Sequence, residues 1–512
     1  MSKKVILIAF VVSLGGFLFG FDAGIISGVM SYAGPEFDLN DWQSGWVVSS
    51  PSFAAMIAML LAGRLSDIIG RKTILIVVAF LYAVSALFSA FAYSYEMLYI
   101  ARMIGGVGFG AALVLAPTYI AEISSAKNRG KLVSLQQLNI VLGFFAAFLS
   151  NYYLNKINTS GSVLFTDETV WRWMLGIEFF PAILYFIFMF FVPKSPRWLY
   201  TKNMVEEAKV ILNRIYGTEI ASEEIKAIEN ATKSKDDSKV SLLSLLKPSL
   251  RFILLVGLVI GVLQQITGIN AVYFYATSIF KQTGIGTDAA FSSGVLLSFI
   301  TVLFTFVAIF LIDKMGRRPL LLIGIAGVSI SLILCAYGFN EATYKLTEQD
   351  LQEIELTGME ASQLSFAVDK VYENDLDFKN DMKASLGTQL YAKNEGAILE
   401  YATTINATLI LFGILGFIAC FAFSLGPVMW VLLSELYPIK YRGLAIGAIG
   451  FVNSFTSWLV QQVFPWELSN LGNALSFLIF GLIALAGFIV LLKILPETKG
   501  KSLEEIEAKY VK

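Results

Sequence analysis

Long apolar runs separated by short polar loops fill the chain from one end to the other. Each run has about 20 residues, which an α-helix needs to cross the hydrocarbon core of a bilayer, about 30 Å thick. The runs, twelve in all, lie at approximately 5–29, 45–64, 73–93, 96–122, 132–153, 172–192, 251–280, 289–312, 318–339, 403–434, 444–465 and 472–495. The pattern predicts an all-α membrane protein with twelve transmembrane helices.

Composition supports this prediction and limits which kinds of functional site the chain can contain. Of the 512 residues, 56% are hydrophobic and 15% are charged, whereas soluble domains average about 25% charged residues. The chain has no His, and its two cysteines, Cys335 and Cys420, lie within predicted spans. We therefore expect no metal site, no cofactor, no disulfide framework and no His-based catalysis. Lys3 and Lys4 lead directly into the first span, and no cleavage site follows it, so we expect no cleavable signal peptide.

Basic residues are distributed so that they indicate an orientation in the membrane. Lys and Arg gather in alternate connections, whereas the connections between them, such as 34–41 and 466–470, are acidic or neutral. The basic connections are the amino terminus, 63–72, 124–131, 193–250, 313–318, 438–443 and the tail. Because cytoplasmic loops are enriched in Lys and Arg, both termini are predicted to be cytoplasmic. The chain shows no sorting signal, so we expect a plasma membrane, that of a bacterium.

Two connections are long enough to hold structure of their own. Residues 196–248 contain apolar positions at helical spacing, which predict short amphipathic cytoplasmic helices; these are Val205, Ala208, Ile211, Leu212 and Ile215. Residues 340–400 form an insertion predicted on the outer side, in which acids outnumber lysines. We expect this insertion to be a solvated, partly helical excursion; binding of a partner or an ion is the alternative.

Loop signatures repeat between the two halves of the chain. The sequence D-I-I-G-R begins at Asp67 and D-K-M-G-R at Asp313, while E-I-S-S-A-K-N-R-G begins at Glu122 and E-L-Y-P-I-K-Y-R-G at Glu435. Without the insertion, the halves are six-helix repeats with matching loops, as in transporters. We predict an amino-terminal bundle (1–195), a cytoplasmic helical linker (196–248), a carboxy-terminal bundle (249–495) with the insertion, and a cytoplasmic tail (496–512).

Seven motifs in order identify a family resemblance. They are GRLSDIIGRK, PTYIAEISSAKNRG, PKSPRWL, QQITGIN, DKMGRR, GPVMWVLLSELYP and PETKG. Together they resemble the sugar porter family of the major facilitator superfamily, which includes glucose facilitators and bacterial proton–sugar symporters. The resemblance runs from about residue 5 to 506 and is broken mainly by the insertion. It implies the major facilitator fold, a hexose, pentose or polyol as substrate, and transport by alternating access.

The same resemblance implies a sugar site made of amides and one indole. The positions that match are Gln137, Gln264, Gln265, Asn270, Trp430 and Asn453, together with Thr301 where many relatives carry Asn. A primary amide offers both a donor and an acceptor to sugar hydroxyls. On a straight helix Gln264 and Asn270 would lie about 240° apart, so we expect a break at Gly268 that turns both inward. The alternative for these amides is hydrogen bonding between helices.

Two further positions depart from the family pattern and leave the substrate open. Ser454 stands where many relatives have a second Trp, although Trp458 lies one turn further on. Phe144 stands where a bacterial xylose symporter has Gln. Each change removes a stacking surface or a hydrogen-bonding group. Glucose, xylose, galactose, fructose and a cyclic polyol such as inositol therefore all remain candidates.

The first span, SLGGFLFGFDAGIISGVM (13–30), carries an acid in its apolar middle. An acid at such depth costs about 2.5–3.5 kcal/mol on insertion scales, which makes Asp22 a functional candidate. The first span runs outward and the fourth inward, so Arg102 can lie at the same depth and pair with it. Glu178 of the sixth span is a third ionisable group in that outer half. On the opposite side of the helix, Gly16, Gly20, Gly24 and Gly28 form a stripe that lets a neighbouring helix approach closely.

Resemblance to the family adds a role for these charges. Proton-coupled sugar porters carry Asp and Arg at the positions of Asp22 and Arg102 and often an acid at that of Glu178, whereas facilitators typically have a neutral residue instead of the Asp. The resemblance therefore implies proton coupling. The alternative is a static ion pair that only orients the first and fourth helices.

Charged loop residues recur at equivalent ends of predicted helices, and we expect them to form a cytoplasmic gate network. The residues are Arg64, Asp67, Arg71, Glu122, Arg129, Asp313, Arg317, Glu435 and Arg442. Among them, we expect Glu122 to pair with Arg129 and Glu435 with Arg442, each seven residues further along the chain. One exposed ion pair contributes only about 0–1 kcal/mol, but several linked pairs can bias a two-state equilibrium. The alternative is that these charges only set the orientation of the chain.

These features together predict a proton-coupled symporter of a monosaccharide or related polyol. A uniporter is the nearest alternative, and a non-transporting sugar sensor is disfavoured because the tail is short. A drug antiporter would lack the amide cluster, and an enzyme would need a nucleophile or metal set that the sequence does not show. The glycine-rich stretch 102–110 lies inside a span and predicts close helix packing, not nucleotide binding. We expect the sugar or polyol, protons and the bilayer as partners, and no nucleic acid.

Overall fold

The computed structural model describes residues 3–125, 128–217, 221, 222, 224, 225, 242–500 and 505. The chain divides into two compact units. Unit 1 comprises residues 1–25, 50–147 and 172–239, and unit 2 comprises 26–49, 148–171 and 240–512. The end of the first span, the start of the second, the end of the fifth and the start of the sixth thus group with the carboxy-terminal half. The domain boundaries expected from the sequence stay a prediction.

Twelve helices in the described part of the chain are long and apolar enough to cross a membrane, which confirms the predicted spans. Two of the spans are bent at short interruptions, and a third is broken. The helices are α1 (Lys3–Glu36), α2 (Asp41–Ile69), α3 (Arg71–Ala90), α4 (Tyr95–Ile123), α5 (Arg129–Thr159), α6 and α7 (Val170–Gly176, Phe179–Phe191), α11 and α12 (Arg251–Ile266, Ile269–Phe274), α14 (Thr287–Met315), α15 (Arg317–Asn340), α19 and α20 (Ala407–Phe423, Leu425–Leu436), α21 (Ile439–Asn470) and α22 (Gly472–Ile494).

Two tight helix-to-helix turns have the same construction in the two units. Gly70 separates α2 from α3 with φ 99°, and Gly316 separates α14 from α15 with φ 95°. This backbone conformation is open to glycine and costly for other residues. The turns place Arg71 and Arg317 at the first position of the helix that follows. The Gly-Arg pair of the repeated loop signature therefore places each arginine at the start of a helix.

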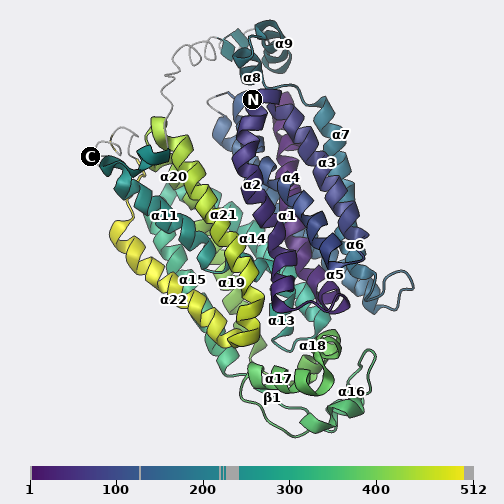
Figure 1. The fold of residues 1–512 in the computed structure, drawn as a ribbon. Coiled ribbons are helices and arrows are strands. Elements are labelled where there is room, and N and C mark those ends of the chain that lie inside the picture. The colour runs from purple at the N-terminus through teal and green to yellow at the C-terminus, as the bar shows by residue number, and fades with distance from the viewer. Residues whose placement is uncertain are drawn as a thin grey trace. The chain divides into compact units, whose positions relative to one another are not determined.

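In unit 1, α3 packs along both α4 and α7 (Figure 1), and α1 lies against α5 through the glycine stripe. A Cβ at Gly20 would overlap the carbonyl oxygen of Ile140, and a Cβ at Gly143 would overlap that of Phe17. The two backbones therefore touch at this crossing. The close approach that the stripe predicts is confirmed.

This crossing gives a test of the packing. We expect Gly20→Ala to force the backbones of α1 and α5 apart and to destabilise the fold by about 1–3 kcal/mol, as overpacking does. Gly63→Ala in α2 is the matched control, because a Cβ there meets nothing within 4 Å. Thermal unfolding of both variants in detergent measures the difference. Equal melting temperatures would contradict the close crossing.

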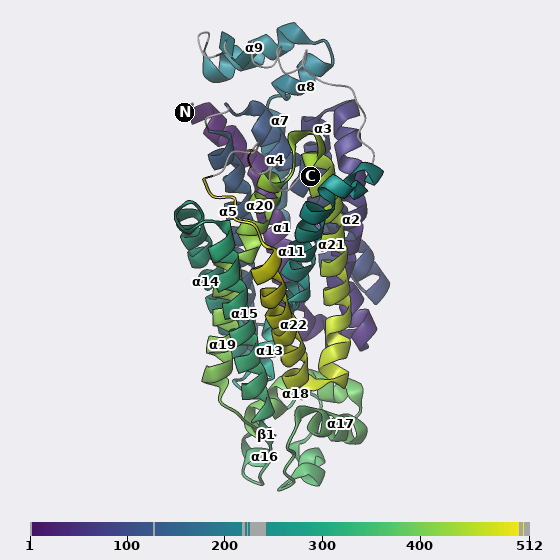
Figure 2. The ribbon, with the colours of Figure 1, turned by 90° about the vertical axis from the view of Figure 1, so that its left-hand side faces the viewer.

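In unit 2, α15 packs along α22 and α19, and α11 packs along α21 (Figure 2). Hydrogen bonds also join the later part of α1, the start of α2 and the end of α5 to the carboxy-terminal helices. Ser27 Oγ lies 3.0 Å from Thr277 Oγ1 in α13 (Ala276–Lys281), Ser49 Oγ donates to Gln462 Oε1 over 2.7 Å, and Asn155 Nδ2 donates to Asp288 Oδ1 over 2.6 Å. Unit 2 is thus held together by side chains from both halves of the sequence.

The insertion is partly helical, as predicted, and it also has an apolar core of its own. Its elements are β1 (Thr343–Tyr344), α16 (Asp350–Glu353), η3 (Ala361–Ala367), α17 (Asp375–Leu386), α18 (Thr388–Ala402) and β2 (Thr403–Thr404). The two strands pair antiparallel, and Tyr344, Tyr372 and Phe378 pack in the core. Asp375 accepts from the backbone N–H and the side-chain Nδ2 of Asn473 at the start of α22. The insertion is therefore more ordered than a solvated excursion, because residues distant in sequence meet in its core.

Residues 196–248 contain the amphipathic helix that the periodicity predicts. The helices are α8 (Pro196–Thr201) and α9 (Val205–Tyr216), followed by the 3₁₀ turns η1 (Leu242–Leu246) and η2 (Pro248–Leu250). Ala208, Leu212 and Ile215 of α9 are buried. Residues 218–220, 223 and 226–241 of this predicted linker lie outside the described residues.

Candidate functional site

The predicted break in the seventh span is present and brings two of the amides predicted for a sugar site together. The helix α11 ends at Ile266, Gly268 adopts a left-handed conformation with φ 87°, and α12 begins at Ile269. As a result, Asn270 Nδ2 donates to Gln265 Oε1 over 2.8 Å. On a continuous helix these side chains would lie on different faces, so the break makes the contact.

Four amides from α11, α12 and α21 form one hydrogen-bonded cluster in unit 2. Gln265 Nε2 donates to Asn453 Oδ1 over 3.2 Å, and Asn453 Nδ2 donates to Gln264 Oε1 over 2.8 Å. Gln264 Nε2 in turn donates to the backbone carbonyls of Leu425 and Gly426. Gln264, Gln265 and Asn453 are buried. The cluster thus places four hydrogen-bonded amides together among helices long and apolar enough to span a membrane.

The other predicted sugar-site residues lie as follows. Thr301 is buried on α14, and its hydroxyl lies 2.7 Å from that of Tyr273. Trp430 on α20 is 42% exposed, which leaves an indole face available for stacking. Gln137 is an exposed side chain of α5 and belongs to unit 1.

The motif comparison missed two polar residues of α21 that touch the amide cluster. Ser457 Oγ accepts from Asn270 Nδ2 over 2.6 Å and from Gln461 Nε2 over 2.8 Å. Both side chains are buried. Their spacing was a usable signal, since Asn453, Ser457 and Gln461 follow one another every fourth residue and so lie on one face of the helix.

The second group of predicted residues lies in unit 1 and is ionisable. Arg102 NH1 lies 3.2 Å from Asp22 Oδ1, and Arg102 NH2 donates to Asp22 Oδ2 over 3.4 Å, so the guanidinium faces the carboxylate with two nitrogens. Asp22, Arg102 and Glu178 are all buried, and Glu178 lies within electrostatic range of the other two. The Asp22–Arg102 contact, which was predicted from the positions of the two residues along their spans, is therefore present.

Two tyrosines that sequence reasoning did not single out lie along the same part of α1. Tyr82 and Tyr185 are fully buried. The Tyr82 hydroxyl donates to the carbonyl of Gly15 over 3.1 Å, and Tyr82 interacts electrostatically with both Asp22 and Glu178. No sequence signal separated these tyrosines from the other aromatic residues of the spans.

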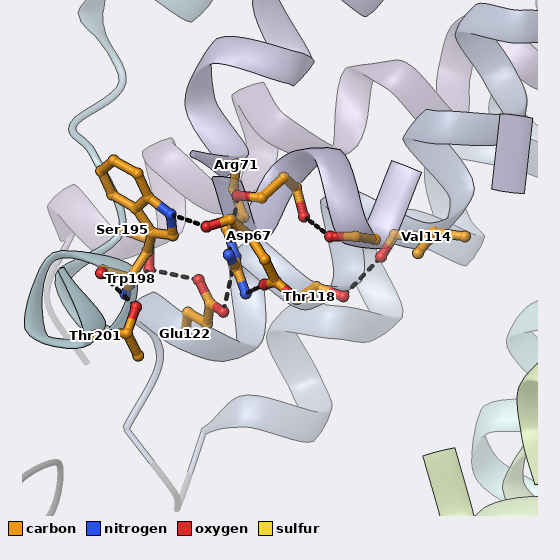
Figure 3. A network of polar contacts seen from close by, with 10 residues as sticks. Asp67, Arg71, Val114, Thr118, Glu122, Ser195, Trp198 and Thr201 are labelled. Carbon is orange, nitrogen blue, oxygen red and sulfur yellow. Dashed lines mark hydrogen bonds and ion pairs between the residues drawn. The ribbon is translucent and has the colours of Figure 1, made fainter. Parts of the chain in front are cut away.

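The charged loop residues of unit 1 form a network around Glu122 (Figure 3). Arg71 lies 2.6 Å from Asp67 and 3.1 Å from Glu122. The Ser195 hydroxyl donates to the other oxygen of Glu122 over 2.5 Å, and Trp198 Nε1 donates to the Asp67 carbonyl over 3.1 Å. The start of α8 is thereby tied to the ends of α2, α3 and α4.

Unit 2 builds the same network from its own copies of the motifs. Arg317 NH2 donates to Glu435 Oε1 over 2.7 Å, and the Thr498 hydroxyl donates to Glu435 Oε2 over 2.6 Å. In both units the hydroxyl belongs to a Pro-x-Ser/Thr sequence. Ser195 follows α7 in unit 1, and Thr498 follows α22 in unit 2. Burial alone would raise the pKa of Glu497. Backbone N–H groups of Lys499 and Thr498 next to it and of Arg317 and Arg318 at the start of α15 donate to its carboxylate and hold the pKa below its usual value.

Other charges that we predicted for the gate are placed differently. Glu122 and Glu435 bond to arginines of a neighbouring helix, Arg71 and Arg317, in place of Arg129 and Arg442 seven residues further along the chain. Arg442 donates to the carbonyl of Tyr437, Arg129 is half-buried at the start of α5, and Arg64 is exposed on α2. Asp313 lies in α14, but its side chain is outside those that the structure describes.

We expect the two kinds of ion pair in these networks to differ in their effect on stability. The Arg317 side chain is 13% exposed and Glu435 25% exposed, whereas Asp67 is 67% exposed. Glu435→Gln should therefore destabilise the protein by about 1–3 kcal/mol, because it leaves a partly buried guanidinium without its charge partner. Asp67→Asn, the matched control, should cost at most about 1 kcal/mol. Thermal unfolding that ranks the two variants in the opposite order would contradict this assignment.

Comparisons with known proteins agree with this arrangement. A profile of the family described as "Sugar (and other) transporter" matches residues 8–354 and 385–510; the unmatched stretch lies in the insertion. The arabinose-proton symporter of Bacillus subtilis is 34% identical over 508 residues, which cover 99% of this chain and 95% of that protein. The major myo-inositol transporter IolT of the same organism is 32% identical, with 98% and 93% covered.

A solved structure of another sugar transporter has a similar fold. The inward open conformation of the xylose transporter XylE from E. coli matches with a TM-score of 0.75 and 28% identity, over 99% of this chain and 100% of that chain. The sequence profile, the relatives that align over nearly their whole length and the fold therefore all indicate one family. The chain belongs to the sugar porter family of the major facilitator superfamily.

Proposed function

We propose that this chain is a proton-coupled symporter of a monosaccharide or related polyol that works by alternating access. Its family supports transport as the activity, not enzymatic catalysis. Relatives that align over nearly its whole length are named as an arabinose-proton symporter and a myo-inositol transporter. The candidate substrates are therefore pentoses, hexoses and inositols.

For sugar binding, the amide cluster of unit 2 is the supporting observation. Gln264, Gln265, Asn270 and Asn453 are held in one hydrogen-bonded arrangement, so few side-chain rotamers need to be fixed when a substrate binds. The indole of Trp430 can pack against the apolar face of a sugar. Gln137 and Thr301 stay predicted ligands.

The buried Asp22–Arg102 pair is the observation that carries proton coupling. One guanidinium contacts the buried Asp22 and lies within electrostatic range of a second buried acid, Glu178, and its single charge can neutralise only one of them. A proton bound to the cluster would remove the remaining charge. A conformational change that alters the contact with Arg102 would therefore change how strongly the cluster holds that proton.

We further propose that both termini and the two charge networks face the cytoplasm, and that the insertion lies outside. The excess of Lys and Arg in the loops that carry the networks supports this orientation. The plasma membrane of a bacterium is the proposed location. The hydrogen bonds from Ser27, Ser49 and Asn155 would then close the outer side of the transporter.

A screen for substrate tests the proposed sugar class. Purified protein is heated with L-arabinose, D-xylose, D-glucose or myo-inositol, and its melting temperature is recorded. Stabilisation by a ligand grows with its concentration relative to its Kd, so at least one compound is expected to raise the melting temperature and to enter proteoliposomes that contain the protein. If none of the four does either, the proposed substrate class is wrong.

A further inference from the structure

The amide cluster has a direction that backbone carbonyls impose. Gln264 Nε2 donates to the carbonyls of Leu425 and Gly426, and Asn453 Nδ2 donates to the carbonyl of Gly261 over 2.8 Å. A carbonyl oxygen can only accept. The NH₂ groups of Gln264 and Asn453 must therefore point at these carbonyls, and their amide oxygens must point away.

This direction passes from amide to amide along the cluster. Because the NH₂ of Asn453 is used, its Oδ1 accepts from Gln265 Nε2. Because the NH₂ of Gln265 is used in this way, its Oε1 accepts from Asn270 Nδ2. Each amide is thus oriented by the one before it, and the series ends at Asn270.

The second N–H of Asn270 is taken by Ser457. Asn270 Nδ2 donates to Ser457 Oγ over 2.6 Å, and a primary amide nitrogen has only two hydrogens. The Ser457 oxygen is itself held in place by Gln461 Nε2, 2.8 Å away, and Gln461 is fully buried. Both donors of Asn270 are therefore used within the protein, and among the residues that the structure describes none donates to the Oδ1 of its half-buried side chain.

From this geometry we infer that Ser457 is a positioning residue. It orients Asn270 so that the side chain can accept a hydrogen bond from a substrate hydroxyl through Oδ1 but has no N–H left to donate to it. This inference rests on the proposed function and adds a polarity to its binding site. The substrate hydroxyl at Asn270 must donate a hydrogen bond to Oδ1. A group at that place that can only accept is not recognised.

Fluorinated and deoxygenated substrates distinguish a donor from an acceptor, because a C–F group cannot donate a hydrogen bond. The probe is whichever of L-arabinose, D-xylose, D-glucose and myo-inositol enters proteoliposomes fastest, with its monodeoxy and monofluoro analogues. In the wild type, one hydroxyl position is expected at which the deoxy and the fluoro analogue lose the same factor in kcat/KM, about 10-fold or more for a lost hydrogen bond to a buried polar group.

Ser457→Ala tests the positioning role at that same position. We expect KM for the parent substrate to rise about 5- to 10-fold with kcat nearly unchanged, since one orienting hydrogen bond is lost. We also expect the loss caused by the deoxy substitution to shrink at this position alone, because Asn270 is no longer held. Ser457→Thr keeps the hydroxyl and should restore the wild-type pattern.

The matched control is Thr456→Val, which removes the neighbouring hydroxyl of α21. Thr456 Oγ1 donates to the carbonyl of Val452 on its own helix, so all analogues should respond to this variant as they do to the wild type. The inference is overturned if Ser457→Ala weakens every analogue by one common factor or behaves as Thr456→Val does. Absence of transport of all four compounds by the wild type would instead overturn the proposed function.

Discussion

Replacing Asp22 by Asn is expected to abolish substrate accumulation driven by a proton gradient while leaving downhill equilibration of the same substrate in place. The reason is that Asn keeps the size of the side chain but cannot take up a proton. With a pH difference of one unit across the membrane, coupling of one proton to one substrate supports an accumulation ratio of about 10, because 1.4 kcal/mol corresponds to a factor of ten. The variant should reach a ratio of about 1.

Uptake of radiolabelled substrate into proteoliposomes, acidic outside, measures this ratio. Glu96→Gln is the matched control, since Glu96 is an exposed acid in the first turn of α4, the helix that carries Arg102. It should accumulate substrate as the wild type does. If Asp22→Asn still accumulates substrate, the pair with Arg102 is static and the proton site lies elsewhere.

Replacing Gln265 by Ala should give the largest loss of substrate affinity. Gln265 joins Asn453 to Asn270, so its removal takes away one amide and releases the orientation of the next. Each buried polar group left without a partner costs about 1–3 kcal/mol, and we expect KM to rise by about 30-fold or more. Transport assays with the compound identified in the thermal screen provide the measurement.

The control for this variant is Gln349→Ala, which removes an exposed amide of the insertion that bonds to Glu353. Substrate affinity should not respond to it. An unchanged KM for Gln265→Ala would remove this residue from the binding site. It would also show that the amide cluster only joins helices, which is the alternative that the sequence left open.

Hydropathy and loop charge were sufficient to predict the twelve spans, because length and apolarity are properties of single segments. The break at Gly268 was also predictable, since glycine interrupts a motif whose polar residues would otherwise diverge. The pairing of Asp22 with Arg102 followed from the direction of the first and fourth spans. In these cases one segment, or two segments at a known depth, contained the information.

Contacts that depend on which helices are neighbours could not be predicted in the same way. Glu122 and Glu435 bond to arginines on adjacent helices, and the sequence had suggested arginines seven residues along the same segment. The core of the insertion brings Tyr344 next to Phe378, a pairing with no periodic signal. Ser457 was missed because it belongs to none of the family motifs, although its four-residue spacing from Asn453 and Gln461 places the three side chains on one face of the helix.

Proton movement caused by the substrate itself is the most direct test of the account. Proteoliposomes that enclose a pH-sensitive dye start with equal pH on both sides, and the transported compound is added outside. Proton coupling through Asp22 predicts that the lumen acidifies as substrate enters, and that Asp22→Asn abolishes the acidification but not the entry. Entry of substrate into wild-type vesicles at the same rate without any pH change would contradict proton coupling and identify the protein as a uniporter.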